Sequence, residues 1–181
     1  MILIGMGGNL SSVYGDPATL LKTALSVMPS FGITVCRLSS FYRTPAMARY
    51  VQPPYVNSVA AIETALPAAD LLQALHRIEA LFGRVRVARW AARTLDLDLL
   101  DYHGQIVTAR GPRGPEAGVG PLPMALPHPG IAERGFVLVP LQEIAPEWRH
   151  PVLGEGAARL IERLEAAQGK GAIAEIRRIR P

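Results

Sequence analysis

The stretch Thr94-Leu95-Asp96-Leu97-Asp98-Leu99-Leu100 alternates leucine with aspartate along most of its length. Successive side chains of a β-strand point to opposite faces, so the pattern predicts a strand over 94–102 with its alternate leucines on one face. Asp96 and Asp98 then project together from the other face. Neighbouring carboxylates repel each other and need positive charge between them. The stretch therefore predicts a Mg²⁺ site, since Mg²⁺ takes one or two carboxylates plus substrate phosphates. An exposed strand face paired with arginines is the alternative.

The other elements follow from apolar periodicity and from the positions of glycine and proline. The expected strands cover 2–7, 33–43, 55–64, 105–107 and 172–179. The expected helices cover 17–28, 67–82, 136–144 and 155–167. The order strand–helix–strand–strand–helix–strand is the split βαβ pattern of ferredoxin-like folds. We therefore expect an α+β fold, with a ferredoxin-like antiparallel sheet and helices packed on it in a three-layer α/β/α arrangement.

Length and composition fit one globular domain over 1–181, with 49% hydrophobic and 19% charged residues. We expect a Gly/Pro-rich inserted loop at 109–126 and a C-terminal extension at 149–181. No apolar run approaches the ~18 residues of a membrane span, and the single cysteine, Cys36, excludes an internal disulfide. The apolar N-terminus lacks the basic lead of a signal peptide, so we expect a cytoplasmic protein. A net charge of +4 is too small to carry nucleic-acid binding by itself.

The segment 83–93 places four arginines directly before the two carboxylates. Arginines alone would indicate a phosphate or nucleic-acid groove, and carboxylates alone would indicate a metal. Together they predict a metal-bound polyphosphate, because arginine supplies the charge that phosphoryl transfer needs. We expect residues 84–92 to close over bound phosphates, with Arg84 engaged only on closure. Arg93 adjoins the acidic strand and is expected to be fixed beforehand. A solvated basic loop is the alternative.

Two further groups combine apolar and polar side chains on one face. Leu72, His76 and Glu79 share a face of the second helix and could line a nucleotide pocket; a half-exposed helix surface is the alternative. Tyr55 and Asn57 point the same way on their strand and offer a ring and an amide. This pair suits a planar, amide-like heterocycle, and a capped edge strand is the alternative.

Two loops carry weaker signals. His128, Arg134 and Phe136 lie within nine residues and could serve a phosphate and a ring together. The run Gly7-Gly8-Asn9-Leu10 resembles a glycine turn but lacks the spacing of a dinucleotide or P-loop motif. This run therefore gives no basis for predicting a nucleotide cofactor.

Short motifs occur in a specific joint order over residues 2–148: Gly8-Asn9-Leu10, Ser39-Ser40-Phe41-Tyr42-Arg43-Thr44-Pro45, Tyr55-Val56-Asn57, Arg77-Ile78-Glu79, Gly83-Arg84, Arg93-Thr94-Leu95-Asp96-Leu97-Asp98, Pro127-His128 and Arg134-Gly135-Phe136. On these motifs the chain resembles the 6-hydroxymethyl-7,8-dihydropterin pyrophosphokinases of folate biosynthesis. The resemblance implies transfer of the β,γ-pyrophosphoryl group of ATP to the hydroxymethyl oxygen of the pterin. The products would be AMP and the pterin diphosphate.

The resemblance also implies a role for each matching residue. Two Mg²⁺ ions would be held by Asp96 and Asp98, which form the catalytic set together with Arg84 and Arg93. The pterin site would be lined by Thr44, Pro45, Met47, Tyr55, Asn57, Trp90 and Phe136. ATP would be contacted by Leu72, His76, Glu79, Arg86, Arg93, Leu99, His128 and Arg134.

Some positions depart from the family pattern. Pro123 and Ala125 stand where an arginine and a threonine lie near the adenine, and His76 stands where a glutamine is common. We expect ATP and 6-hydroxymethyl-7,8-dihydropterin as partners, a monomer, and neither nucleic acid nor membrane. Two alternatives stay open: a ferredoxin-like nucleic-acid-binding module, and a pterin-binding paralogue without catalysis.

Overall fold

The structure, a computed structural model, describes residues 1–46, 51–84, 92–108, 124–169 and 171–179. The strands are β1 (Ile2–Gly8), β2 (Thr34–Leu38), β3 (Tyr42–Thr44), β4 (Tyr55–Glu63), β5 (Asp96–Tyr102) and β6 (Arg177–Arg178). They form an antiparallel sheet in the order β5-β1-β4-β3-β6, with β2 also paired to β4. The helices are α1 (Pro17–Val27), α2 (Ala68–Leu81), α3 (Gly135–Ile144), α4 (Ala157–Gln168) and the short α5 (Gly171–Ala174), with 3-10 turns η1 (Met28–Phe31) and η2 (Ile131–Glu133).

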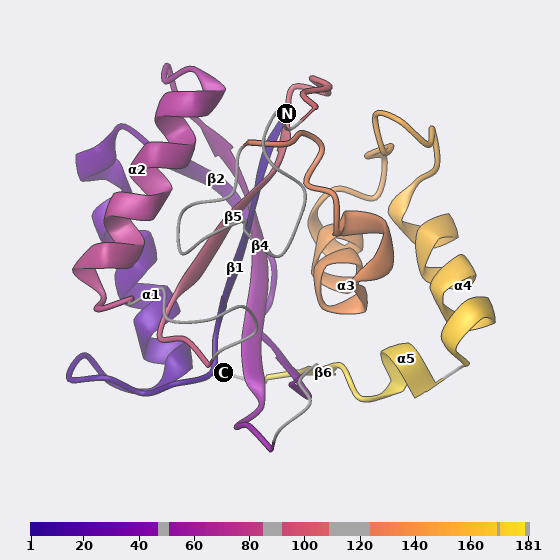
Figure 1. The fold of residues 1–181 in the computed structure, drawn as a ribbon, viewed down its shortest axis with the longest axis horizontal. Helices are drawn as coiled ribbons and strands as arrows, with labels where there is room; N and C mark the ends of the chain where they lie inside the picture. The colour runs from indigo at the N-terminus through magenta and orange to yellow at the C-terminus, as the bar shows by residue number, and fades with distance from the viewer. Residues whose placement is uncertain (47–50, 85–91, 109–123, 170, 180–181) are drawn as a thin grey trace, which may run out of the picture.

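The sheet separates two helical layers (Figure 1). Helices α1 and α2 cover one face, α3 covers the other, and α4 lies outside α3. From β1 through α1, β2 and β3, β4, α2 and β5 the chain follows the predicted ferredoxin-like order. The expected α+β fold is therefore confirmed.

Each face of the sheet has its own hydrophobic core. Ile4 and Met6 of β1 pack toward α1 and α2, whereas Leu3 packs toward α3. Leu97 and Leu99 of β5 belong to the first core, as the leucine alternation predicts. Asp96 and Asp98, which alternate with these leucines, are therefore directed to the α3 face.

The expected strand over 33–43 is two strands, because Ser39 interrupts it. Its Oγ accepts a hydrogen bond from the Val59 main-chain N at 3.0 Å and lies 2.9 Å from the Ser58 Oγ. Ser39 N still donates to Val59 O at 2.9 Å, but Val59 N donates to the Ser39 side chain instead of to a main-chain oxygen. As a result β2 and β3 pair with β4 separately.

Two other expected strands are corrected. Residues 105–107 form no strand, because Val107 pairs with Leu126 in an isolated bridge instead of extending a hairpin on β5. Within 172–179, only β6 reaches a partner strand, and the chain before it forms α5. The expected inserted loop at 109–126 lies outside the described residues except for 124–126.

The expected C-terminal extension packs on the α3 layer. Ala157, Leu160 and Leu164 of α4 are buried in the second core. Asp101 of β5 connects to this layer, since its Oδ2 accepts a hydrogen bond from Trp148 Nε1 at 2.7 Å. None of the helices formed by the described residues is long and apolar enough to cross a membrane.

Candidate active site

Two glycines of β1 lie between the acidic pair of β5 and a polar side chain of β4. Gly7 is in register with Asp96 on one side and Asn57 on the other, and Gly5 is in register with Asp98. These positions share the α3 face, because the alternate residues of the same strands fill the core beneath α1 and α2. Because the glycines have no side chains, the Asn57 amide packs directly over Gly7 and the Leu100 side chain packs over Gly5.

The amide of Asn57 is held in place from two sides. A Cβ at Gly7 would lie 2.6 Å from Asn57 Oδ1, so only glycine allows this close approach. On the other side, Asn57 Nδ2 donates to Thr44 Oγ1 at 2.8 Å, and both residues are buried. The predicted pair of Thr44 and Asn57 is thus brought together with a fixed orientation.

Asp96 lies between two arginines. Arg93 Nη1 donates to Asp96 Oδ2 at 2.7 Å, and Arg84 Nη1 contacts both Asp96 Oδ1 and Glu79 Oε1. The side chain of Arg84 is only 11% exposed. Two carboxylates therefore hold its guanidinium. The expectation that Arg84 contacts phosphate only on closure stays a prediction.

Asp98 has a more distant ion-pair partner than Asp96. Burial, and then the charge of Asp96, raise the pKa of Asp98 to about 6, although Arg134, Arg84 and Arg93 oppose this shift. The nearest ion-pair partner of Asp98 is Arg134, whose Nη1 lies 3.9 Å from Asp98 Oδ2. The cluster still favours additional positive charge close to Asp98.

The donor set fits a magnesium ion that is completed by substrate. Carboxylate oxygens on a rigid strand are ligands that Mg²⁺ prefers. Within the described ranges, no group of three or more His, Cys, Asp and Glu side chains could hold a metal ion. Asp96 and Asp98 would therefore supply only part of a coordination shell, and phosphate oxygens and water would supply the rest.

Glu79 supports the site from beneath. It is 2% exposed, and its Oε1 accepts a hydrogen bond from Leu97 N at 2.8 Å besides contacting Arg84. The alternative of a half-exposed helix surface applies only to Leu72 and His76, which are partly buried. The expected nucleotide contacts of the three residues stay predictions. Burial differs at Glu79 because two groups from other segments surround its carboxylate.

Tyr55 lies in the same charged cluster. Burial raises the pKa of the Tyr55 hydroxyl, with Asp96 adding to the shift and Arg93 and Arg84 opposing it. Tyr55 is in register with Thr44 on β3. The predicted ring therefore lies near Asp96, and the predicted amide lies across β1 from it. Pro45 is exposed beyond the end of β3.

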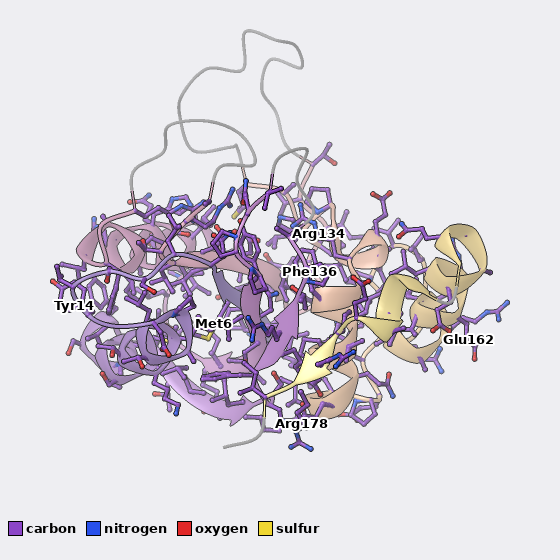
Figure 2. All side chains as sticks on the ribbon, turned by 90° about the horizontal axis from the view of Figure 1, so that it is seen from below. Met6, Tyr14, Arg134, Phe136, Glu162 and Arg178 are labelled. Carbon is purple, nitrogen blue, oxygen red and sulfur yellow. The ribbon has the colours of Figure 1, made fainter. Side chains whose placement is uncertain are left out.

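Arg134 and Phe136 enter from the start of α3 (Figure 2). The guanidinium carbon of Arg134 lies 5.9 Å from the centre of the Phe136 ring. The same arginine faces Asp98. The structure thus brings Arg134 and Phe136 together and places the arginine beside Asp98. Their expected contacts with ATP and the pterin stay predictions.

His128 is fixed next to β5. Its main-chain N donates to Leu100 O at 2.8 Å, and its Nδ1 accepts from Gly130 N at 3.1 Å. Burial, and then the charge of Arg134, lower the pKa of His128 to about 4. The imidazole is therefore neutral at pH 7, with the ring proton on Nε2.

Asn9 is a site-building residue that the sequence reasoning missed. It is 3% exposed; its Oδ1 accepts from Arg93 N at 2.9 Å, and its Nδ2 donates to Pro53 O at 3.1 Å and to Gln52 Oε1 at 3.2 Å. Asn9 therefore connects the end of β1 to the segments that enter β4 and β5. The available signal was its place in the motif Gly8-Asn9-Leu10, to which no role was assigned.

For four other predicted site residues, the structure shows no side chain at the site. Met47, Arg86 and Trp90 lie outside the described residues, as does Pro123. Leu99 has its side chain in the core beneath α1 and α2. The roles of these residues in binding stay predictions.

Comparison with known proteins gives concordant relatives. The 2-amino-4-hydroxy-6-hydroxymethyldihydropteridine pyrophosphokinase of Synechocystis sp. is 38% identical over 165 residues, covering 90% of this chain and 75% of the relative. The enzyme of the same name from Haemophilus influenzae is 39% identical over 145 residues, covering 80% of this chain and 81% of the relative.

A solved structure shares the fold. The wild-type HPPK-DHPS chain of Plasmodium falciparum, with STZ-DHP, has a TM-score of 0.74 at 12% identity and matches 98% of this chain. This chain spans 46% of the length of that protein.

The family comparison confirms the resemblance inferred from the motifs. The family model described as 7,8-dihydro-6-hydroxymethylpterin-pyrophosphokinase (HPPK) matches residues 3–146. That range includes β1 to α3 and every described residue of the acidic, amide and arginine groups. The chain belongs to the HPPK family.

Proposed function

We propose that the protein transfers the β,γ-pyrophosphoryl group of ATP to the hydroxymethyl oxygen of 6-hydroxymethyl-7,8-dihydropterin, as a step of folate biosynthesis. In this reaction a bond forms between the hydroxymethyl oxygen and the β-phosphorus, and the bond from the β-phosphorus to the oxygen that leaves with AMP breaks. The observation that carries the proposal is the register of β5, β1 and β4, which sets Asp96 and Asp98 across the glycines of β1 from Asn57.

The charged half of the site suits a polyphosphate. Arg93 and Arg84 contact Asp96, and Arg134 faces Asp98, so cations surround the carboxylates. A bound triphosphate would accept hydrogen bonds from these guanidinium groups, which orient it and offset charge that develops during transfer. Loss of one such contact costs about 3 kcal/mol of transition-state stabilisation by analogy with oxyanion donors.

Magnesium dependence belongs to the proposal. Asp96 and Asp98 would hold Mg²⁺, which when bound neutralises phosphate charge and polarises the reacting phosphoryl group. Burial, and then the charge of Asp96, raise the pKa of Asp98, and a bound cation would offset both effects, which supports this assignment. No covalent intermediate on the protein is required.

The neutral half of the site suits the pterin. The buried Asn57 amide, oriented by Thr44, offers hydrogen-bonding groups to a planar heterocycle, and Phe136 offers a ring face. Tyr55 lies in the charged cluster, near Asp96 and Arg93. A monomeric state and a cytoplasmic location stay predictions.

The alternative of a nucleic-acid-binding module is not favoured. Such modules place aromatic residues beside basic ones on the sheet, whereas Asp96 and Asp98 occupy β5 in this fold. The family match also points to pyrophosphoryl transfer.

The direct test is formation of AMP from MgATP with and without the hydroxymethyl dihydropterin. We expect pterin-dependent AMP formation that stops when the divalent cation is chelated. Asp96→Ala or Asp98→Ala should reduce turnover by about 10³-fold, equal to ~4 kcal/mol. The matched control is Asp70→Ala, which removes an exposed carboxylate from the first turn of α2. Near-normal turnover in both site variants would refute the metal assignment, and pterin-independent AMP formation would refute the reaction.

A further inference from the structure

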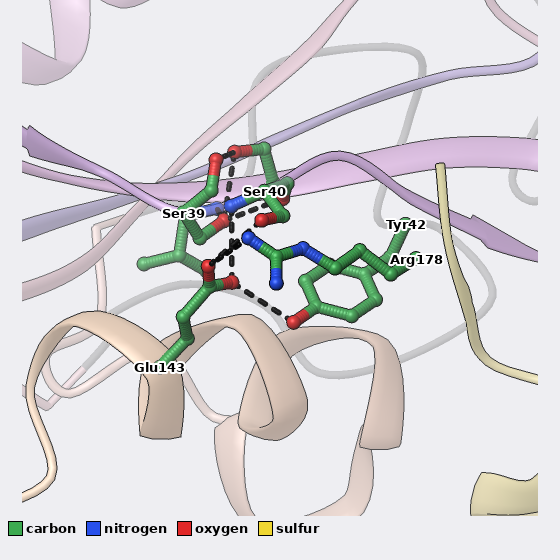
Figure 3. A network of polar contacts seen from close by, with 7 residues as sticks. Ser39, Ser40, Tyr42, Glu143 and Arg178 are labelled. Carbon is green, nitrogen blue, oxygen red and sulfur yellow. Dashed lines mark hydrogen bonds and ion pairs between the residues drawn. The ribbon is translucent and has the colours of Figure 1, made fainter. Parts of the chain in front are cut away.

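Glu143 of α3 collects donors from two separate strands and the segment before β3 (Figure 3). Its Oε2 accepts from Ser40 N at 3.0 Å and from Tyr42 OH at 2.9 Å. Its Oε1 accepts from Ser40 Oγ at 2.8 Å and from Arg178 Nη2 of β6 at 3.3 Å. The Glu143 carboxylate therefore binds Tyr42 of β3, Ser40 just before β3, and Arg178 of the C-terminal strand β6.

The network requires a carboxylate rather than an amide. Oε2 faces the Ser40 main-chain N–H and Oε1 faces the Arg178 guanidinium, and neither of these groups can accept a hydrogen bond. The two hydroxyls can donate to either oxygen, and a carboxylate is an acceptor at both oxygens. Burial alone would raise the pKa of Glu143, but the hydrogen bonds from Ser40 and Tyr42 and the charge of Arg178 outweigh it and lower that pKa. A glutamine at this position would direct an NH₂ group at donors.

Strand β3 has little other support. It pairs with β4 over three residues and with β6 over two. One further main-chain hydrogen bond joins Ile179 N to Phe41 O at 2.7 Å. The bonds to Glu143 are therefore a substantial share of what fixes this short strand against the α3 layer.

The position of β3 determines the orientation of the site amide. Tyr42 and Thr44 are two residues apart, so they stand on the same face of the strand. Tyr42 is in register with Asn57, and Thr44 Oγ1 accepts the hydrogen bond from Asn57 Nδ2. A shift of β3 relative to β4 would therefore move the group that orients Asn57.

We propose that Glu143 is a positioning residue for pterin binding, which acts by anchoring β3 through Ser40 and Tyr42. Arg178 completes the anchor, so the C-terminal strand contributes to pterin affinity from outside the site. The inference rests on the proposed function and extends it, because it assigns substrate affinity to a helix residue and a C-terminal strand.

The test measures KM for the pterin, KM for MgATP and kcat in Glu143→Gln, Tyr42→Phe and Arg178→Ala. Glu143→Gln is expected to raise the pterin KM about tenfold, equal to ~1.4 kcal/mol. KM for MgATP and kcat should stay within about twofold of wild type, because β3 acts on the site through Thr44 and Asn57, which belong to the proposed pterin site. Tyr42→Phe removes one hydroxyl and should raise the pterin KM by about threefold, an effect in the range of a single hydrogen bond. Arg178→Ala should have a smaller effect in the same direction, since its side chain is 66% exposed.

The matched control is Glu147→Gln, which removes a carboxylate just beyond α3. Glu147 faces Arg37 of β2 at 3.8 Å, and both side chains are exposed. Its kinetics should equal those of wild type. Thermal melting and calorimetric pterin binding accompany the kinetics, and Tyr42→Phe keeps the test decisive if Glu143→Gln is poorly folded.

Three outcomes would overturn the anchor, and a fourth would overturn the proposed function. An unchanged pterin KM in both Glu143→Gln and Tyr42→Phe would overturn the anchor. Equal increases in both KM values, or an equal effect of Glu147→Gln, would indicate general structural loss and also overturn it. A wild-type protein that forms no pterin-dependent AMP would instead overturn the proposed function.

Discussion

Replacement of Gly7 by alanine tests how closely β1 must approach the pterin edge. The new Cβ would lie 2.6 Å from Asn57 Oδ1, whereas ordinary contacts begin at 3.4 Å, so the amide must move by about 0.8 Å. A shift of that size exceeds what the 2.8 Å hydrogen bond from Asn57 to Thr44 tolerates. Breaking a buried hydrogen bond costs about 1–3 kcal/mol, which corresponds to roughly a 10- to 100-fold loss of pterin affinity.

The control for this variant lies two residues away on the same strand and face. A Cβ at Gly5 meets Leu100 Cδ2 at 3.3 Å, a contact that a small rotation of the leucine relieves. Gly5→Ala should therefore lower the free energy of unfolding by about 1 kcal/mol and leave pterin affinity within about threefold of wild type.

Isothermal calorimetry would measure pterin affinity for both variants, and urea denaturation would measure their stability. Wild-type pterin affinity in Gly7→Ala would refute the reasoning, because it would mean that the amide can move without consequence. Equal losses of affinity in the two variants would also refute it, since of the two glycines only Gly7 lies against the Asn57 amide.

Three more expectations follow from the contacts of the site. Arg84→Ala removes the guanidinium that contacts the buried Glu79 carboxylate, so it should lower the free energy of unfolding by about 3 kcal/mol. Urea denaturation would measure this loss, and unchanged stability would contradict the contact. Asn9→Ala removes the acceptor for Arg93 N and should raise KM for both substrates by about tenfold, which is in the range of one buried hydrogen bond. Steady-state kinetics would measure both KM values, and an increase for only one substrate would contradict this expectation. His128 should titrate near 4 by NMR, below its ordinary 6.5, so the unfolded chain binds more protons between these values. The stability that His128 contributes is therefore lost as pH falls from about 6.5 toward 4, and a measured pKa of 6 or above would contradict its burial.

Much of the fold could be predicted because it is encoded locally. Asp16 caps α1 by accepting a hydrogen bond from Thr19 N at 2.8 Å, with Pro17 in the first turn, as the dipeptide predicts. The acidic pair follows from alternation along β5. Such features depend on neighbouring residues in the sequence, so a single chain reveals them.

The features that could not be predicted depend on partners far apart in the sequence. The break at Ser39 arises from hydrogen bonds to β4, which nothing in the local pattern announces. Glu79 is buried because Leu97 N and Arg84 surround its carboxylate. Glu143 occupies an ordinary helix position, and its role appears only when β3 and β6 are placed beside α3.

The sheet order also links ligand binding to folding of the whole sheet. Gly7, Asn57 and Asp96 lie on neighbouring strands but come from distant parts of the sequence, so they meet only after long loops have closed. A partly folded chain has no such meeting point and no affinity for a ligand that spans it. Substrates at about 100 times their dissociation constant would therefore stabilise the native state by ~2.7 kcal/mol each. In a cell, the supply of substrate would then help to set how long newly made copies of this protein survive proteolysis.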